Sequence, residues 1–196
     1  MADIQGSFLY KNMHTTQQVS DIKEYFTHML VNEKFETIIE VGTSYGGLTY
    51  ILDDIIKENY LESKIFTFDN GYKDYVEDSL NKRGCIYIIM DEKTSDFPDT
   101  IYNIIKNGGK TLILCDGGDK KYEFNLISDF LKKGDFLMAH DYCDSKIVFD
   151  NLIKNKIWNW FEISYEDIKD KITENNLEEY NVIDFQKAVW ACYRKK

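Results

Sequence analysis

Two spacings of hydrophobic residues alternate along most of the chain. Short apolar runs that end in a polar or glycine-containing turn predict strands, and segments with apolar residues at helical spacing predict amphipathic helices. The predicted strands are Thr37–Val41, Lys64–Phe68, Cys85–Met90, Thr111–Cys115 and Phe136–Ala139. The predicted helices are Gln17–Asn32, Leu48–Lys57, Tyr72–Asn81, Thr100–Lys106 and Phe124–Lys132. Strands separated by helices favour an α/β fold with a parallel, doubly wound sheet and right-handed crossovers.

The pattern is less regular after Asp141. Ile147–Ile157 and the polar segment Asp167–Glu179 are predicted as helices, and Ala188–Tyr193 is predicted as a final strand. The position of a sixth strand is left open by this pattern. No linker rich in Pro, Gly or Ser and no internal repeat divides the sequence, so a single domain is predicted.

Composition narrows the classes of partner and compartment. The 196 residues are 43% hydrophobic, enough to bury a core, and carry a formal net charge of −10. This charge repels phosphate backbones and anionic membranes, so we expect neither nucleic acid nor a membrane as a partner. The four cysteines form no CxxC pair, and the sequence shows no secretory signal or membrane-spanning run. We therefore expect a cytoplasmic, reducing environment.

The first predicted strand runs into a glycine-rich turn, Glu40 to Gly47 (EVGTSYGG). Glycines let the backbone approach a ligand, and the helix that follows presents free N–H groups. The spacing is GxxxGG and differs from the dinucleotide pattern GxGxxG, and no Lys-Ser/Thr pair follows to bind a phosphate. The turn therefore favours a cofactor that carries a carboxylate and an amine. The alternative is an ordinary strand-to-helix turn.

Acidic residues follow the next two strands. Asp69 lies about 20 residues beyond the turn, where a carboxylate can accept hydrogen bonds from a ribose diol. Its alternative role is to stabilise the Asn70-Gly71 turn. Asp91 is a candidate contact for the adenine or the ribose edge, and its alternative is a solvated loop with helix caps.

The last two predicted parallel strands end in Asp116-Gly117-Gly118-Asp119 and in His140-Asp141-Tyr142. If these strands are neighbours, Asp116 and Asp141 form an oxygen-rich cluster, with His140 as a third candidate. Such a cluster can hold a divalent cation such as Mg²⁺, which prefers oxygen ligands. The alternative is that each acid only caps a helix.

The order of these motifs resembles a known family. Gln17-Gln18 and Asp21 precede ETIIEVGTSYGG, KIFTFD, LILCDGGDKKYE and LKKGDFLMAHDY. Together they resemble the S-adenosylmethionine-dependent O-methyltransferases of the cephalosporin hydroxylase and rhamnosyl O-methyltransferase family, over about Gln17 to Tyr142. Two positions depart from that family: His140 stands where an acid is usual, and Gly118 stands where the sugar methyltransferases have a second acid.

The resemblance implies a fold and a set of binding residues. The fold is a Rossmann-like, mostly parallel seven-stranded sheet with helices on both faces and an antiparallel last strand. Within 1–196 it implies an N-terminal helical segment (1–35), a cofactor-binding core (36–142) and a C-terminal part that completes the sheet (143–196). The implied S-adenosylmethionine contacts are Glu40, Gly42, Thr43, Ser44, Tyr45, Gly46 and Asp69. Asp91 and Asp116, nominated by their positions after strands, complete the predicted cofactor-binding set. The implied Mg²⁺ ligands are Asp116, His140 and Asp141.

The predicted activity is methyl transfer to an oxygen of a small, sugar-like acceptor. The catalytic candidates are His140, Asp141 and Asp119, with His140 or Asp119 as the base. Two alternatives remain: a cofactor- or nucleotide-binding module without methyl transfer, and a nucleotide-sugar enzyme of the same fold. The sequence leaves a homo-oligomer open.

Overall fold

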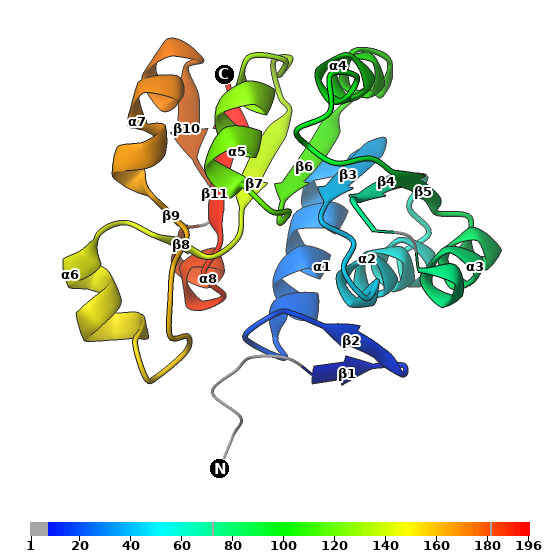
Figure 1. The fold of residues 1–196 in the computed structure, drawn as a ribbon, viewed down its shortest axis with the longest axis horizontal. Coiled ribbons are helices and arrows are strands. Elements are labelled where there is room, and N and C mark those ends of the chain that lie inside the picture. The colour runs from blue at the N-terminus through cyan, green and yellow to red at the C-terminus, as the bar shows by residue number, and fades with distance from the viewer. Residues whose placement is uncertain (1–7, 72, 181) are drawn as a thin grey trace.

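The computed structural model describes residues 8–71, 73–180 and 182–196. Its centre is a seven-stranded sheet with the order β10-β11-β7-β6-β3-β4-β5 (Figure 1). The strands are β3 (Thr37–Val41), β4 (Lys64–Asp69), β5 (Ile86–Ile89), β6 (Thr111–Cys115), β7 (Phe136–Ala139), β10 (Leu177–Glu179) and β11 (Ala191–Lys195). Five strands run parallel, and β11 is antiparallel to both of its neighbours. The predicted fold class is confirmed.

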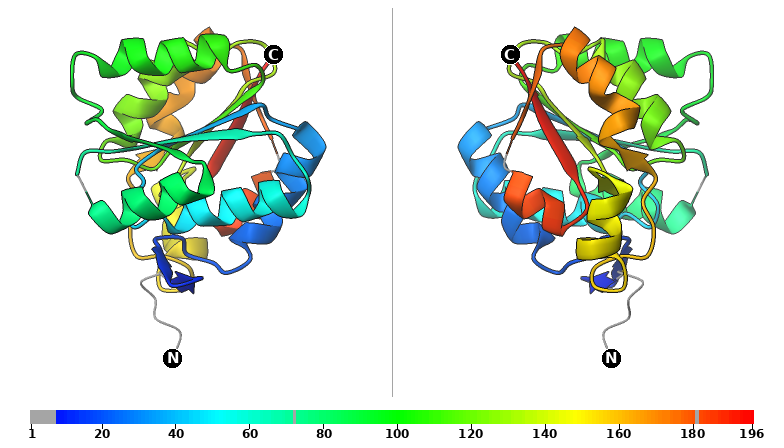
Figure 2. Two further views of the ribbon diagram at one scale, coloured as in Figure 1. Left: turned by 90° about the vertical axis from the view of Figure 1, so that its right-hand side faces the viewer. Right: turned by 90° about the vertical axis from the view of Figure 1, so that its left-hand side faces the viewer.

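Helices cover both faces of this sheet (Figure 2). One layer contains α1 (Ile22–Glu33), α2 (Gly47–Glu58), α3 (Asp74–Arg83) and α8 (Val182–Lys187), and the other contains α4 (Phe97–Asn107), α5 (Lys120–Ser128) and α7 (Tyr165–Glu174). Successive strand residues point to opposite faces, so Ile38 packs in the core of the first layer and Ile39 in the core of the second. This is why the central strands read as continuous apolar runs.

The prediction was least accurate where local spacing conflicted with tertiary structure. Helix α7 ends at Glu174, and the sixth strand, β10, occupies Leu177–Glu179, which the polar periodicity had assigned to the helix. Asn176 between them has a φ of +49°, a left-handed conformation that ends the helix. Helix α3 begins at Asp74; the predicted start at Tyr72 lies outside the described residues.

Additional elements surround the sheet. A hairpin of β1 (Phe8–Tyr10) and β2 (Met13–Thr15) precedes α1, where only a helical segment had been expected. The predicted helix Ile147–Ile157 is a short helix α6 (Lys146–Val148) followed by a π-helical turn η1 (Phe149–Ile153). The strands β8 (Tyr142–Cys143) and β9 (Ile163–Ser164) pair around this insertion.

The hairpin lies directly over the start of α2. A Cβ atom at Gly47 would lie 2.2 Å from the carbonyl oxygen of His14, so only glycine lets the two backbones meet there. The second glycine of the GG pair therefore has a packing role, because it seats the hairpin beside the glycine-rich turn.

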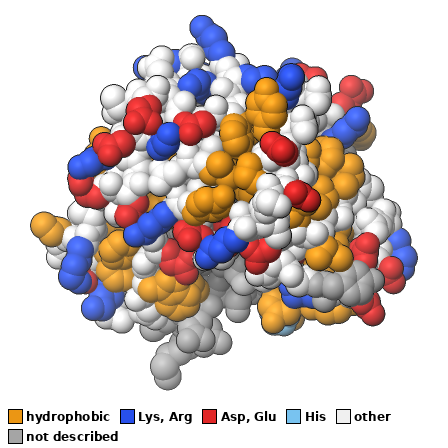
Figure 3. Space-filling model, turned by 45° about the horizontal axis from the view of Figure 1, so that its top comes forward, with side chains coloured by type: hydrophobic (Ala, Val, Ile, Leu, Met, Phe, Trp, Pro, Cys, Tyr) orange, Lys and Arg blue, Asp and Glu red, His pale blue; other side chains and the backbone are white. Residues whose placement is uncertain are grey.

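Charges of both signs are interspersed over the face shown in Figure 3, although the net charge is −10. Of the helices within the described ranges, none is both long enough and apolar enough to cross a membrane. All four cysteines are buried and free, as expected for reduced thiols.

Candidate functional site

A cavity of about 260 Å³ opens at the carboxyl ends of the parallel strands. This is the edge at which ligands bind in doubly wound sheets. It is lined by Val41, Gly42, Ser44, Phe68, Asp69, Asn70, Lys73, Met90, Glu92, Asp116, Gly117 and Gly118. Four of these, Gly42, Ser44, Asp69 and Asp116, belong to the predicted cofactor-binding set.

Gly42 brings the ends of β3 and β6 into contact. Its φ is +99°, and a Cβ atom there would lie 2.1 Å from the carbonyl oxygen of Asp116. Its N–H donates to the Phe68 carbonyl at 2.8 Å, while the N–H of Asp116 donates to the Val41 carbonyl at 2.8 Å. A side chain at position 42 would therefore separate the loops that form this wall of the cavity.

The Asp69 carboxylate organises the next wall. It accepts hydrogen bonds from the backbone N–H groups of Ser44 and Gly71, each at 2.8 Å, and from the ammonium of Lys73 at 3.1 and 3.2 Å. The carboxylate lines the cavity and also stabilises the Asn70-Gly71 turn, so the role in the turn is confirmed and the contact with a ribose remains a prediction. Lys73, the residue before α3, had no sequence signal, because an isolated lysine in a polar segment is normally solvated.

Glu40 lies behind the turn. Its buried carboxylate accepts hydrogen bonds from the hydroxyls of Thr49 at 2.5 Å and Thr67 at 2.6 Å. Burial raises the pKa of Glu40 to about 8, against the effect of these two bonds. Thr43 shares the network through a 2.6 Å bond to Thr67. Both residues therefore fix the turn to β4 from inside the protein.

Two other turn residues lie outside the lining of the cavity. Tyr45 is exposed, with its ring centroid 5.7 Å from that of His14 in the hairpin. Gly46 takes a φ of +77° immediately before α2. Direct contacts of these residues with a cofactor remain predictions.

The loop after β5 presents Glu92 to the cavity. Glu92 is buried and lines the cavity, and its Oε1 lies 2.9 Å from where a Cβ of Gly118 would be. Asp91, the sequence candidate, accepts the N–H of Lys93 at 2.8 Å on an exposed turn. The strand period ends before this loop, so the pattern could not decide which acid faces inward.

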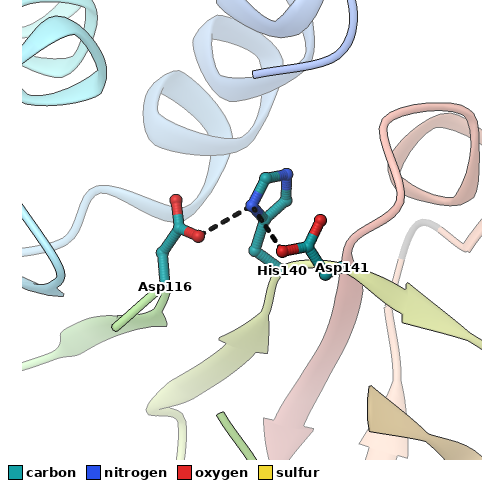
Figure 4. A group of neighbouring side chains, drawn as sticks. All are labelled: Asp116, His140 and Asp141. Carbon is teal, nitrogen blue, oxygen red and sulfur yellow. Dashed lines mark hydrogen bonds and ion pairs between the residues drawn. The ribbon is translucent and has the colours of Figure 1, made fainter. Parts of the chain in front are cut away.

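Asp116, His140 and Asp141 form a compact cluster at the ends of β6 and β7 (Figure 4). His140 Nδ1 lies 2.7 Å from Asp116 Oδ1 and 3.9 Å from Asp141 Oδ2. One donor atom from each residue lies within 4.8 Å of the others. Opposite ligands of an octahedral Mg²⁺ are about 4.2 Å apart, so these side chains fit around one small cation.

Residues just before α1 and just before β11 contact this cluster. Gln17 donates to Asp116 at 3.2 Å and accepts from the Trp190 indole N–H at 2.8 Å. Gln18 Oε1 lies 2.5 Å from His140 Nε2, and the Gln18 amide donates to Asp141 at 3.4 Å. Trp190 stacks on His140 with centroids 4.6 Å apart. Only the Gln17-Gln18 pair had a sequence signal, as part of the resemblance.

Lys120 is a second cation at the cluster, and sequence reasoning missed it. Its Nζ lies 2.7 Å from Glu162, 3.3 Å from Asp141 and 4.0 Å from Asp116. Burial opposes its charge, but Asp116 and Asp141 outweigh burial and raise the pKa of Lys120. The same two carboxylates raise the pKa of His140, again against burial. The two carboxylates thus favour the charged forms of both Lys120 and His140.

Asp119 has a different position from the one expected of a base. Its carboxylate accepts the N–H of Tyr122 at 3.1 Å, which caps α5, and lies 3.7 Å from Lys93. Glu123 is buried behind the same loop and accepts the N–H groups of Gly117 and Asp119, each at 3.2 Å. Burial raises the pKa of Glu123 to about 8.

We compared the chain with known protein families, sequences and structures, and only solved structures match it. Neither family models nor curated protein sequences match the chain. Among solved structures, CmcI without ligand matches with a TM-score of 0.67 at 11% identity, over 96% of this chain and 76% of CmcI. CmcI with Mg and S-adenosylmethionine matches with a TM-score of 0.62 at 10% identity, over the same shares of both chains.

Two further methyltransferases share the architecture. MycE from the mycinamycin biosynthetic pathway, in complex with Mg, S-adenosylhomocysteine and mycinamycin VI, matches with a TM-score of 0.55 at 12% identity. That match covers 88% of this chain and 48% of MycE, so the chain spans about half of MycE. A Podospora anserina methyltransferase bound to S-adenosylhomocysteine matches with a TM-score of 0.54 at 12% identity, over 91% and 80% of the two chains. The chain therefore has the fold of S-adenosylmethionine-dependent methyltransferases.

Proposed function

We propose that this protein is an S-adenosylmethionine-dependent methyltransferase that modifies a hydroxyl oxygen of a small molecule. One observation carries the proposal: the cavity at the carboxyl ends of β3 to β6 meets the buried acid–histidine cluster at Asp116, which belongs to both. This shared residue supports our proposal that a cofactor site and a reaction site have a common wall. CmcI and MycE, which have this fold, bind S-adenosylmethionine or S-adenosylhomocysteine together with Mg.

The residues of the cavity suit the three parts of the cofactor. Asp69 offers carboxylate oxygens to the ribose diol, and the half-buried side chain of Met90 offers an apolar contact for the adenine. Glu92 is the acid placed to accept the adenine amine. The methionine part fits the glycine-rich turn at Gly42 and Ser44, where backbone N–H groups favour a carboxylate.

In the proposed reaction the acceptor oxygen forms a bond to the methyl carbon while the bond from that carbon to sulfur breaks. The products are a methyl ether, neutral S-adenosylhomocysteine and a proton. His140 in its neutral form is placed to take this proton, and Asp116 and Asp141 would stabilise the imidazolium that forms, whereas Asp119 is occupied as a helix cap. The protein's main contribution is to hold the two reactants in line.

Asp116 and Asp141 are the residues that would hold Mg²⁺, because they supply the hard oxygen donors of the cluster. A bound Mg²⁺ would lower the pKa of the acceptor hydroxyl and orient it. His140 is a softer donor and is better suited to proton transfer.

For the acceptor we propose a small polyhydroxylated, sugar-like molecule, and for the compartment the cytoplasm. The motif resemblance supports this acceptor class, and MycE was solved with mycinamycin VI. The free, buried cysteines support a reducing compartment.

Titration calorimetry with S-adenosylmethionine, S-adenosylhomocysteine and NAD⁺, with and without Mg²⁺, tests this proposal. We expect micromolar binding of the first two ligands and none of NAD⁺. Binding of NAD⁺ alone would refute the methyltransferase. Binding of S-adenosylhomocysteine without methylation of any polyhydroxylated acceptor in a screen would instead support a cofactor-binding module.

A further inference from the structure

We infer that the Lys120 ammonium is a built-in cation of the Asp116–His140–Asp141 cluster, so that a divalent ion must displace it to bind. Its importance for catalysis rests on the proposed function, but the competition between the two cations does not. Its evidence is the arrangement of charged atoms around two carboxylate oxygens.

Lys120 and His140 face the same two oxygens. His140 Nδ1 approaches Asp116 Oδ1 at 2.7 Å and Asp141 Oδ2 at 3.9 Å. Lys120 Nζ approaches those same atoms at 4.0 and 3.3 Å. A divalent ion bound by these oxygens would therefore lie close to the ammonium, and like charges at such distances in a partly dehydrated site repel strongly.

The position of Lys120 is fixed by the fold. It is the first residue of α5, its side chain is only 6% exposed, and its ammonium also donates to the Gly117 carbonyl at 3.1 Å. Its neighbour Lys121 points outward, with a side chain that is 50% exposed and paired with Asp167 at 2.8 Å. Two adjacent lysines thus differ in whether their charge reaches the cluster.

Glu162 gives the ammonium an alternative partner. Its carboxylate lies 2.7 Å from Lys120 Nζ and is 45% exposed, at the outer side of the cluster. When an ion takes the oxygens of Asp116 and Asp141, Lys120 retains Glu162. Without Lys120 or a bound ion, the largely inaccessible carboxylates of Asp116 and Asp141 would be poorly compensated, which is costly.

The test is to titrate metal-stripped protein with Mn²⁺. Electron paramagnetic resonance of the free ion and calorimetry both measure the binding. We expect Lys120→Met to bind Mn²⁺ at least about tenfold more tightly than the wild type, because it removes the competing charge. Lys121→Met is the matched control: it changes net charge equally and should alter Mn²⁺ affinity by less than about twofold. Lys120→Arg keeps the charge and should bind as weakly as the wild type.

The inference is overturned if Lys120→Met binds Mn²⁺ no more tightly than the wild type, or if Lys120→Arg or Lys121→Met gains as much. Thermal unfolding establishes that each variant is folded. If Lys120→Met does not fold, Lys120→Gln, which keeps a polar side chain, is measured under the same criteria. Calorimetry with S-adenosylhomocysteine on the same proteins separates the proposed function from the role of Lys120. A wild type that does not bind S-adenosylhomocysteine refutes the proposed function, and the Mn²⁺ comparison still decides the role of Lys120.

Discussion

The two halves of the site are built in different ways. The cofactor half, formed by the loops after β3, β4 and β5, depends on backbone geometry: Gly42 allows a close approach, and Asp69 accepts N–H groups from two turns. The cation half, formed by the loops after β6 and β7, depends on side chains from distant segments, such as Gln17 and Gln18. Changes in one half should therefore alter cofactor binding, and changes in the other should alter chemistry.

The largest expected effect is on Asp141 in the cation half. Asp141→Asn removes a negative charge from the reaction site, and we expect the rate of methyl transfer to fall at least about 100-fold. The affinity for S-adenosylhomocysteine should change by less than about threefold, because Asp141 does not belong to the described cavity lining. Steady-state kinetics with an acceptor found by screening, together with calorimetry, measure both quantities. A parallel loss of cofactor affinity would show that the halves are not separable.

Gly42→Ala tests the backbone geometry of the cofactor half. The new methyl group would meet the Asp116 carbonyl oxygen at 2.1 Å with φ at +99°, so we expect the free energy of unfolding to fall by about 3 kcal/mol or more. Gly84→Ala is the control, since Gly84 has a φ of +89° but open space around it, and about 1–2 kcal/mol is expected there. Denaturant unfolding measures both. Equal losses would mean that the close approach of the loops has no energetic importance.

A smaller effect is expected for Asp69→Asn. Losing the charge weakens the bonds to Ser44 and Gly71 and the contact proposed for the ribose, so the affinity for S-adenosylhomocysteine should fall by about tenfold. Asp91→Asn, on the exposed turn, should leave that affinity within about twofold of the wild type. Calorimetry distinguishes the two acids, and the reverse order of effects would restore Asp91 as the binding residue.

The smallest expected effect is on the pH dependence of the free energy of unfolding, which one buried glutamate in each half influences. Glu40 and Glu123 each have a pKa raised by burial from 4.5 to about 8. Their protonated forms stabilise the fold fully below pH 4.5, and that contribution is lost as the pH rises toward 8. Between pH 5 and pH 8.5, the free energy of unfolding of Glu40→Gln should therefore rise by about 1 kcal/mol or more relative to that of the wild type. Glu123→Gln should do the same, and unfolding curves at the two pH values measure it. A pH-independent difference for either variant would show that this glutamate is ionised in the folded protein.

The same contrast explains what the sequence could predict. Five strands and the glycine-rich turn were identified because local periodicity and backbone chemistry determine them. Asp116, His140 and Asp141 were expected together because parallel strands collect their carboxyl ends at one edge. The sequence did not reveal Lys120, because its periodicity gives no sign that one of two adjacent lysines is buried.

Other features could not be predicted because the local pattern of residues does not determine them. The choice between Asp91 and Glu92 depends on how a loop turns after its strand ends. Strand β10 is polar because it lies at the edge of the sheet, and its pattern continues that of α7. The hairpin was missed because its two strands have three residues each, too few to establish a period.

The bond from Trp190 to Gln17 joins positions 173 residues apart in the sequence. During synthesis on a ribosome, the turn at Gly42 and the strands beside it emerge long before Trp190. His140 therefore has no stacking partner until Trp190 has left the exit tunnel. The contacts of Trp190 that support the arrangement proposed for chemistry are therefore completed only at the end of synthesis.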